Sequence, residues 1–391
     1  MTEVFLCAHR RTPIGRHGGS LAMVRPDDMA ALVIDGLLDL HPGLAVDEVV
    51  MGCANQAGED NRNVARMAIL LSRLPEAVPA LTVNRLCASG LDAVIAGARI
   101  IRDGADVVIA GGVESMSRAP FVMAKAETAF SRDVSVHDTT IGWRFVNDRI
   151  AQAFGIDSMP ETAENVAEEF AVARADQDGF ALRSQQRYDA AWHAADILPV
   201  TIRGRKGDTV VTADEHPRAT SLDRLAALPA PFRAGGTVTA GNAAGINDGA
   251  AAVLLASAEG VRRHGLTPLA RLGRAASAGV APRIMGIGPI AAVQRLVARG
   301  VHAPSDMDVI ELNEAFAAQA LACTRAWGLA DDDARVNAHG GGISMGHPLG
   351  MSGARIAGTA ARRLAEGGGA AALVTLCVGV GQGVALELLA I

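Results

Sequence analysis

Two cysteines and one histidine lie in short segments whose composition suits nucleophilic catalysis. Cys87, in VNRLCASGLDAV, follows a strand-like run and precedes a helical one, so we expect its thiol at a helix N-terminus. The positive end of the helix dipole and the free N–H groups there favour the thiolate, which is the nucleophilic form. A buried cysteine with a purely structural role is the alternative at this position.

The other two residues lie in glycine-rich segments. His347, in GGGISMGHPLGMSG, is expected in a constrained loop rather than a helix, and an imidazole acts as a base near neutral pH. A loop histidine bonded only to backbone is the alternative. Cys377, in TLCVGVGQG, ends an apolar run before alternating glycines, where backbone N–H groups can bind an oxyanion.

Together these residues favour acyl transfer, in which a thiol takes the acyl group, a base activates it and backbone donors stabilise the oxyanion. Asn313, in ELNEAFAAQAL, follows a strand-like run, and taken alone it is typical of a helix N-cap. The remaining histidines show no metal-ligand spacing, so we predict no metal site.

Composition excludes several classes of function. The chain has 391 residues and a net charge of −6, which argues against a nucleic-acid protein. No uncharged apolar run is long enough for a membrane span, so we expect no membrane partner. The five cysteines include no closely spaced pair, which favours free thiols in a reducing compartment, and we expect a cytoplasmic protein.

The chain alternates between strand-like and helical patterns in two separate regions. Strands are expected near 46–51, 80–84, 106–110, 308–312, 370–377 and 383–389, and helices over 61–74, 89–101, 314–327 and 352–365. This alternation predicts an α/β fold with a weak internal duplication. Residues 119–245 are more polar and form an expected insertion, with one helix over 161–195 that bends near Ala173.

The sequence resembles the thiolase family over essentially its whole length. Six segments carry the resemblance in the family's order: NRLCASG, GGVESMSRAP, TAGNAAGINDGA, NEAFAAQA, GGISMGHPLGMSGAR and TLCVGVGQG. The resemblance implies two duplicated α/β/α halves with mixed sheets, at 1–118 plus 246–268 and at 269–391. It also implies an inserted loop domain at 119–245 that binds coenzyme A.

The resemblance also implies roles for matching residues. Cys87 would be the acylated nucleophile, His347 its base, and Cys377 the group that moves a proton on the substrate. Asn313 would hold a water in one oxyanion hole, in place of the helix-cap role, and the N–H groups of Cys87 and Gly379 would form the other.

Contacts to coenzyme A, the implied co-substrate, would come mainly from the insertion. The residues implied are Met159, Arg218, Ala244, Gly245, Ala315 and Phe316. Three positions depart from the family's pattern: Ala244 replaces a frequent serine, Pro160 a common glycine, and Val380 a glycine in the turn after Cys377. A positive φ angle at residue 380 would strain valine.

Four further segments, among them TTIGWRFVN and APRIMGIGP, most resemble 3-oxoadipyl-CoA thiolases of aromatic-acid breakdown. That substrate ends in a carboxylate, for which Arg144, or a near neighbour such as Arg132 or His137, is the candidate partner; solvated loop charges are the alternative. Other readings are an acetoacetyl-CoA or general 3-oxoacyl-CoA thiolase, a ketosynthase-like condensing enzyme, and a non-catalytic CoA-ester carrier. No bound cofactor is expected, and the resemblance implies a homotetramer or a dimer.

Overall fold

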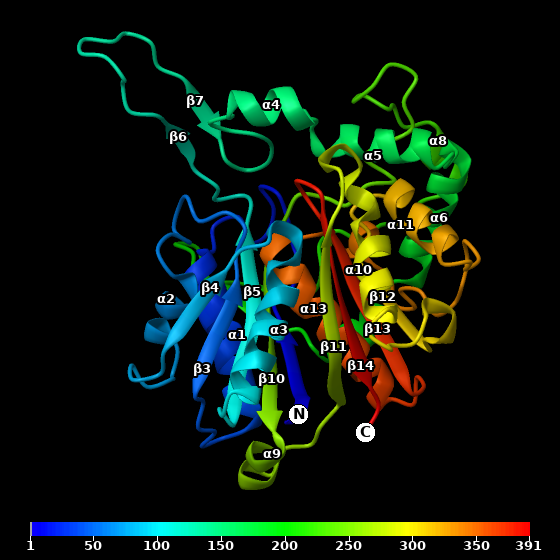
Figure 1. Ribbon diagram of the computed structural model, residues 1–391. Helices are drawn as coiled ribbons and strands as arrows, with labels where there is room; N and C mark the ends of the chain where they lie inside the picture. The colour runs from blue at the N-terminus through cyan, green and yellow to red at the C-terminus, as the bar shows by residue number, and fades with distance from the viewer. Residues whose placement is uncertain (1) are drawn as a thin grey trace.

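One mixed sheet runs through the whole molecule. The computed structural model describes residues 2–391 and contains a ten-stranded sheet, in which nine strands follow the order β12-β13-β14-β11-β1-β10-β5-β3-β4 and β2 pairs with β10 (Figure 1). The strands are β1 (Val4–Arg11), β2 (Gly15–Arg16), β3 (Glu48–Gly52), β4 (Ala80–Val83), β5 (Val107–Ser115), β10 (Asn247–Ser257), β11 (Ala270–Gly279), β12 (Val309–Leu312), β13 (Ala371–Val378) and β14 (Gln382–Leu389).

The sheet has two halves of similar plan. In the first, β4, β3 and β5 are parallel, and β10 and β1 are antiparallel to their neighbours. In the second, β12 and β13 are parallel, and β14 and β11 run antiparallel. The halves meet where β1 pairs with β11 at Phe5↔Arg271 and Leu6↔Ala270. Strands such as β5, β10 and β13 are buried along their length, as expected for continuous apolar runs covered on both faces.

Helices cover both faces of the two halves. Helices α3 (Ser89–Arg102) and α13 (Leu349–Ala365) share one apolar core with strands of both halves, so they form the central layer. Helices α1 (Pro26–Leu40) and α2 (Val64–Leu71) pack on the outer face of the first half. Helices α10 (Gly288–Val297) and α11 (Ala317–Ala326) do so on the second, and α9 (Ala258–His264) follows β10.

Glycines allow α3 and α13 to cross closely. A Cβ at Gly353 would overlap the backbone N of Leu91, and a Cβ at Gly112 of β5 would overlap the Gly350 carbonyl oxygen. The first turns of the two helices therefore lie against each other and against the end of β5. Because Cys87 precedes α3 and His347 precedes α13, this crossing positions both residues.

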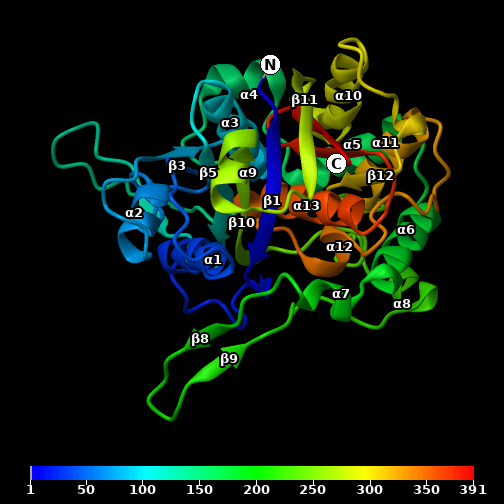
Figure 2. The ribbon, with the colours of Figure 1, turned by 90° about the horizontal axis from the view of Figure 1, so that it is seen from below.

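The region 119–245 forms short helices and two projecting hairpins. Its elements are β6 (Phe121–Met123), β7 (Val136–Asp138), α4 (Asp148–Phe154), α5 (Met159–Glu169), α6 (Arg174–Arg187), α7 (Ala190–Ala194), β8 (Val200–Ile202), β9 (Thr209–Val211) and α8 (Leu222–Ala226). The β6–β7 hairpin projects at the top left of Figure 1, and the β8–β9 hairpin projects in Figure 2. Over residues 2–391, no helix combines the length and the hydropathy needed to cross a bilayer.

The single helix expected over 161–195 is wrong in detail, because three helices occupy this segment. The first break falls at the expected place, since Ala171 has φ +51° and Ala173 is extended. A second break at Tyr188 and Asp189 was not predicted. There the Asp189 carboxylate accepts a hydrogen bond from the Trp192 N–H at 3.0 Å and caps α7.

Candidate active site

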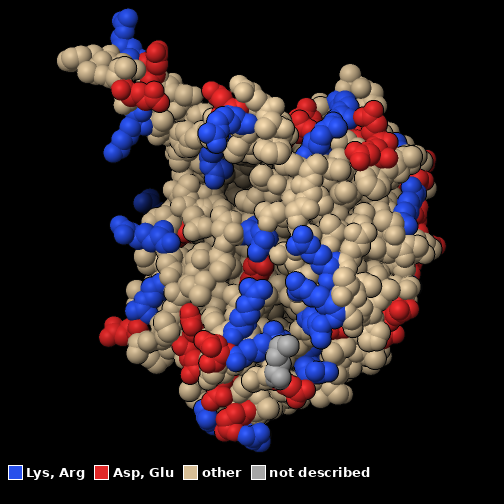
Figure 3. Space-filling model, in the orientation of Figure 1, with Lys and Arg blue, Asp and Glu red and all other residues tan. Residues whose placement is uncertain are grey.

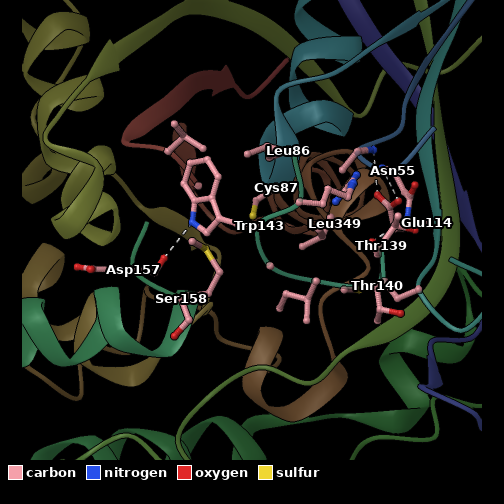
Figure 4. Close-up of a pocket in the computed structure, with 18 residues that line it drawn as sticks. Asn55, Leu86, Cys87, Glu114, Thr139, Thr140, Trp143, Asp157, Ser158 and Leu349 are labelled. Atoms are coloured by element: carbon pink, nitrogen blue, oxygen red, sulfur yellow. Dashed lines mark hydrogen bonds between the residues drawn. The ribbon is translucent and has the colours of Figure 1, made fainter. Parts of the chain in front are cut away.

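A pocket of about 210 Å³ lies where the two halves and the insertion meet. In the orientation of Figure 3, the surface is hollowed beneath the segment that carries β7 and α4. The pocket is lined by Ala54, Asn55, Leu86, Cys87, Glu114, Met116, residues 139–144, Asp157, Ser158, Met159, Leu349, Gly379 and Val380. Figure 4 shows the Cys87 sulfur between Trp143 and Leu349.

Cys87 lies in a single 3₁₀ turn, Leu86–Ala88, that leads into α3. Leu86 has φ +46°, which turns the chain sharply at the end of the incoming segment. Burial raises the pKa of the thiol to about 11, although hydrogen bonding from the backbone N–H groups of Gly379 and Cys87 itself opposes the rise. Burial therefore outweighs the N–H groups that favour the thiolate, and the thiol needs a base.

His347 is buried in the loop before α13 and is fixed on both sides of its ring. The Ser352 hydroxyl donates to the Pro348 carbonyl oxygen at 2.8 Å, so it accepts from Nδ1–H of His347 at 2.6 Å. This leaves the lone pair on Nε2, which faces the Asn313 side-chain nitrogen at 3.3 Å. Burial lowers the pKa of His347 to about 3, so the imidazole is neutral and can accept a proton.

Asn313 does not cap α11, whose N-cap is Phe316. Its side chain turns toward His347 instead, and its Oδ1 has no hydrogen-bond partner within residues 2–391 although it is buried. An unpaired buried oxygen beside the His347 ring is an acceptor that a water or a substrate group can satisfy. The helix-cap interpretation is therefore wrong.

Cys377 lies at the end of β13 and is fully buried. Its side chain packs in a small apolar cluster with Ala315, Phe316 and Met159. Burial raises the pKa of Cys377 well above its usual value, and the Cys87 and Cys323 thiols raise it further. The turn after it holds Val380 at φ +63°, the strained conformation that the glycine at this position of the family would avoid.

Only one of the six residues implied for coenzyme A lines this pocket. Met159, the first residue of α5, lines the pocket itself. Ala244 donates its N–H to the Ala315 carbonyl oxygen at 2.9 Å, and the neighbouring residue Ala243 pairs with Phe316. Gly245 lies against the His216 ring, and the Arg218 guanidinium donates to the Ala240 carbonyl oxygen at 3.0 Å. Ala243, Ala315 and Phe316 thus pack in one cluster with Cys377.

Arg144 lines the same pocket as Cys87, on the segment between β7 and α4. It is half-buried, and its guanidinium makes no ion pair with any carboxylate of residues 2–391. The adjacent Trp143 donates its indole N–H to the Asp157 carbonyl oxygen at 3.3 Å, which anchors this segment over the pocket (Figure 4). Two other candidates for this role, Arg132 and His137, lie outside the pocket lining.

Sequence reasoning missed three residues that hold the site together. Ser352 fixes the His347 ring, Asn247 accepts from the His347 backbone N–H at 2.9 Å, and Glu114 binds the N–H of Gly350 at 2.8 Å. Each lies within a segment that resembles thiolases, but none is a nucleophile or a base. Glu114 could have been noticed from the sequence, because it is a charged residue near the end of a predicted buried strand.

Family models for known proteins cover nearly the whole chain. Residues 4–259 match the thiolase N-terminal domain and residues 266–390 match the thiolase C-terminal domain. The chain belongs to the thiolase family. This thiolase has the fold of solved relatives: human mitochondrial 3-ketoacyl-CoA thiolase superposes with a TM-score of 0.91 at 38% identity, covering 100% of this chain and 99% of that one.

Curated relatives with higher identity carry more specific names. The beta-ketoadipyl-CoA thiolase of Pseudomonas aeruginosa is 60% identical, covering 99% of this chain and 98% of that protein. The 3-oxoadipyl-CoA/3-oxo-5,6-dehydrosuberyl-CoA thiolase of Escherichia coli K12 is 57% identical over 99% of each chain. An acetyl-CoA acetyltransferase of Syntrophomonas wolfei is 40% identical over 98% of each chain, so the sequence lies nearer to the first two.

Proposed function

We propose that this thiolase cleaves 3-oxoadipyl-CoA with coenzyme A, giving acetyl-CoA and succinyl-CoA. One observation carries the choice of substrate: Arg144, without a carboxylate partner in residues 2–391, lines the pocket that holds the nucleophile Cys87. The two relatives named for this substrate are 57–60% identical over nearly the whole chain.

In the first step, Nε2 of His347 takes the proton of the Cys87 thiol, and the sulfur attacks the 3-keto carbon. The bond between carbons 2 and 3 then breaks, leaving succinyl on Cys87 and the enolate of acetyl-CoA. Cys377 donates its proton to the enolate carbon, which releases acetyl-CoA. The hydrogen bond from Nδ1–H to Ser352 supports this role, because it leaves the lone pair of the imidazole on Nε2, beside the Asn313 side chain.

In the second step, the Cys377 thiolate takes the proton of the incoming CoA thiol, whose sulfur attacks the acyl group on Cys87. Succinyl-CoA leaves, and Cys87 recovers its proton through His347. The backbone N–H groups of Cys87 and Gly379 would bind the acyl oxygen, because both favour a negative charge on the Cys87 sulfur and lower its pKa. Asn313, through a water, and His347 would bind the thioester oxygen. One such donor typically contributes about 3 kcal/mol to lowering the barrier.

Coenzyme A would reach Cys87 along the insertion. Met159 lies at the pocket, and residues 244–245 and 315–316 would border the pantetheine arm, with Arg218 at the nucleotide end. A solved human mitochondrial 3-ketoacyl-CoA thiolase in complex with CoA superposes with a TM-score of 0.90, which supports CoA as the co-substrate. Ala244 has no hydroxyl to offer the cofactor, so one hydrogen bond of about 1 kcal/mol is absent at this position.

The experiment measures CoA-dependent cleavage of 3-oxoadipyl-CoA, acetoacetyl-CoA and longer unbranched 3-oxoacyl-CoA by wild type and Arg144→Ala. We expect wild type to prefer 3-oxoadipyl-CoA. We expect Arg144→Ala to lose about 10- to 100-fold in kcat/KM on that substrate alone, because a charge-assisted bond is worth about 1.5–3 kcal/mol. Arg149→Ala, an arginine outside the pocket lining, is the matched control.

Equal losses on all substrates would refute the role of Arg144 and favour a general thiolase. Mass spectrometry after addition of acetyl-CoA separates the remaining alternatives, since an enzyme of this mechanism gains one acetyl group on Cys87 and a CoA-ester carrier does not. Cys87→Ala is expected to abolish both the acetyl adduct and turnover.

We also propose that the enzyme is a cytoplasmic homo-oligomer, a dimer or tetramer. The β4 edge of the sheet is only half-buried, and the hairpin near β6 and β7 exposes Phe121, Phe130 and Val136. Such apolar surface on an outer hairpin is typical of an interface between copies. All five cysteines are free, which suits a reducing compartment. Sedimentation velocity of the purified protein measures the oligomeric state.

A further inference from the structure

A buried carboxylate lies in the wall of the catalytic pocket and takes no part in the steps above. Glu114 is the second-last residue of β5 and is 1% exposed. Figure 4 shows Glu114 clustered with Asn55 and Thr139 on one side of Cys87, with Trp143 on the other side. A buried charge is unfavourable unless it is fully hydrogen-bonded, so its partners indicate what it does.

Three backbone N–H groups from two other segments bind this carboxylate. Ala54 and Asn55, in the loop after β3, donate at 3.0 and 2.9 Å, and Gly350 donates at 2.8 Å. Gly350 lies in the first turn of α13, three residues after His347. Glu114 therefore ties the peptide that carries the proposed base to the strand end beside Cys87. These donors occupy both oxygens, so we assign the group to positioning rather than to binding a cation.

A second arm runs from the same carboxylate to the segment that faces the acyl chain. The Asn55 side chain donates to the carbonyl and hydroxyl oxygens of Thr139 at 3.0 and 3.1 Å. Thr139 begins the 139–144 stretch of the pocket wall, which ends at Arg144. A series of buried contacts thus connects the loop that carries His347 to the 139–144 stretch. It runs from Gly350 through Glu114 and Asn55 to Thr139.

The packing around Gly350 leaves little room for the base loop to move toward β5. A Cβ at Gly112 would overlap the Gly350 carbonyl oxygen, and a Cβ at Gly350 would overlap that of Val113. Contacts this close prevent Gly350 from moving toward β5, and the hydrogen bond from its N–H to Glu114 opposes movement away from β5. A shift of about 1 Å between reacting groups can lower a rate about a hundredfold.

We propose that Glu114 is a positioning residue of this thiolase: it holds the His347 loop, and through Asn55 the 139–144 segment, at fixed places relative to Cys87. The inference rests on the roles proposed for Cys87 and His347. It requires an ionised carboxylate, because three N–H donors need acceptor sites on both oxygens. An amide at this position offers one oxygen and turns an NH₂ group toward at least one donor.

Ionisation of Glu114 lowers the free energy of unfolding, because the carboxylate is buried. Burial raises the pKa of Glu114 to about 7, with the backbone hydrogen bonds opposing it, and Cys53, Asp60 and Cys87 are the titratable groups that face it. A carboxyl whose pKa is higher in the fold than in the unfolded chain destabilises the fold as pH rises from the unfolded pKa to the folded one. The thermal midpoint of wild type should therefore fall between about pH 5 and 7 on account of this group.

The test compares Glu114→Gln with wild type in the full-length enzyme, with Glu311→Gln as control. Glu311 is equally buried, on β12, and bonds Arg363 at 2.9 Å outside the pocket. For Glu114→Gln we expect kcat to fall at least about tenfold while KM for CoA changes less than about threefold. We also expect its thermal midpoint to depend less on pH between 5 and 7. Glu114→Asp, which keeps the charge but withdraws the oxygens by one methylene, should lose kcat while keeping that pH dependence.

A folded Glu114→Gln enzyme with the kcat of wild type would overturn the inference, and so would an equal loss of kcat in Glu311→Gln. If Glu114→Gln does not fold, Glu114→Asp decides, because wild-type kcat in that variant contradicts positioning. Failure of the proposed function has a different signature, since wild type itself would then gain no acetyl group on Cys87.

Discussion

Replacing Ser352 with alanine tests whether the tautomer of His347 matters for turnover. The Ser352 hydroxyl is fully buried, donates to the Pro348 carbonyl oxygen and accepts from Nδ1–H of His347 at 2.6 Å. Without it, the Nδ1–H form leaves a buried donor unpaired, which costs about 1–3 kcal/mol and removes the preference for a basic Nε2. That free energy corresponds to a loss of about 5- to 150-fold in kcat.

The assay follows the consumption of 3-oxoacyl-CoA at saturating CoA, together with the rate at which the acyl group appears on Cys87. We expect both rates to fall in Ser352→Ala and KM for CoA to stay near wild type. Ser257→Ala is the control, because Ser257 is also buried and bonds Asp106 at 2.7 Å, far along the sheet from the pocket. A Ser352→Ala enzyme that keeps kcat within about twofold of wild type would refute the reasoning.

Two further substitutions test the energetics of the fold. Val380→Gly should raise the free energy of unfolding by about 1 kcal/mol, because a valine at φ +63° is strained and a glycine is not. Urea unfolding measures this difference, and a destabilised variant would contradict it. Asp214→Asn should lower the free energy of unfolding by about 3–5 kcal/mol, because it leaves the buried Arg11 guanidinium, bonded at 2.6 and 2.8 Å, without its counter-charge. Burial alone would raise the pKa of Asp214, but the Arg11 charge and hydrogen bonds outweigh it and lower the pKa. The pair therefore stabilises above the unfolded pKa, and wild type should lose this stability on acidification below about pH 4, whereas Asp214→Asn should show no such loss.

The layered α/β architecture could be predicted from the sequence because buried parallel strands and helices have distinct periods. The expected helix over 89–101 is α3, at Ser89–Arg102, and the strand over 370–377 is β13, at Ala371–Val378. Prediction failed in the insertion, where Tyr188 and Asp189 end one helix and begin another. No proline or glycine marks that break, and the cap that Asp189 provides depends on a local turn.

Cys87 and His347 could be proposed as nucleophile and base from the sequence because their flanking glycines are unusual, whereas the residues that support them could not be predicted. Ser352 and Glu114 act through hydrogen bonds whose geometry arises only when α13 packs against β5. Asn313 shows the limit most clearly. Its neighbours suit a helix cap, and only the tertiary structure turns its side chain toward His347. The N–H groups at the helix end favour the Cys87 thiolate as expected, but burial, which the sequence does not show, raises the pKa of the thiol by more.

The glycine-lined crossing of α3 and α13 has a consequence for how this enzyme can diverge. The proposed nucleophile lies in one half and the proposed base in the other, and the halves are joined by the core around α3 and α13 as well as by strand pairing at Phe5 and Leu6. Even a single methyl group added at Gly353 would force α3 and α13 apart and increase the separation of the segments that carry Cys87 and His347. New acyl preferences can therefore arise in the insertion, whose loops tolerate change, while the helix crossing itself leaves evolution almost no freedom.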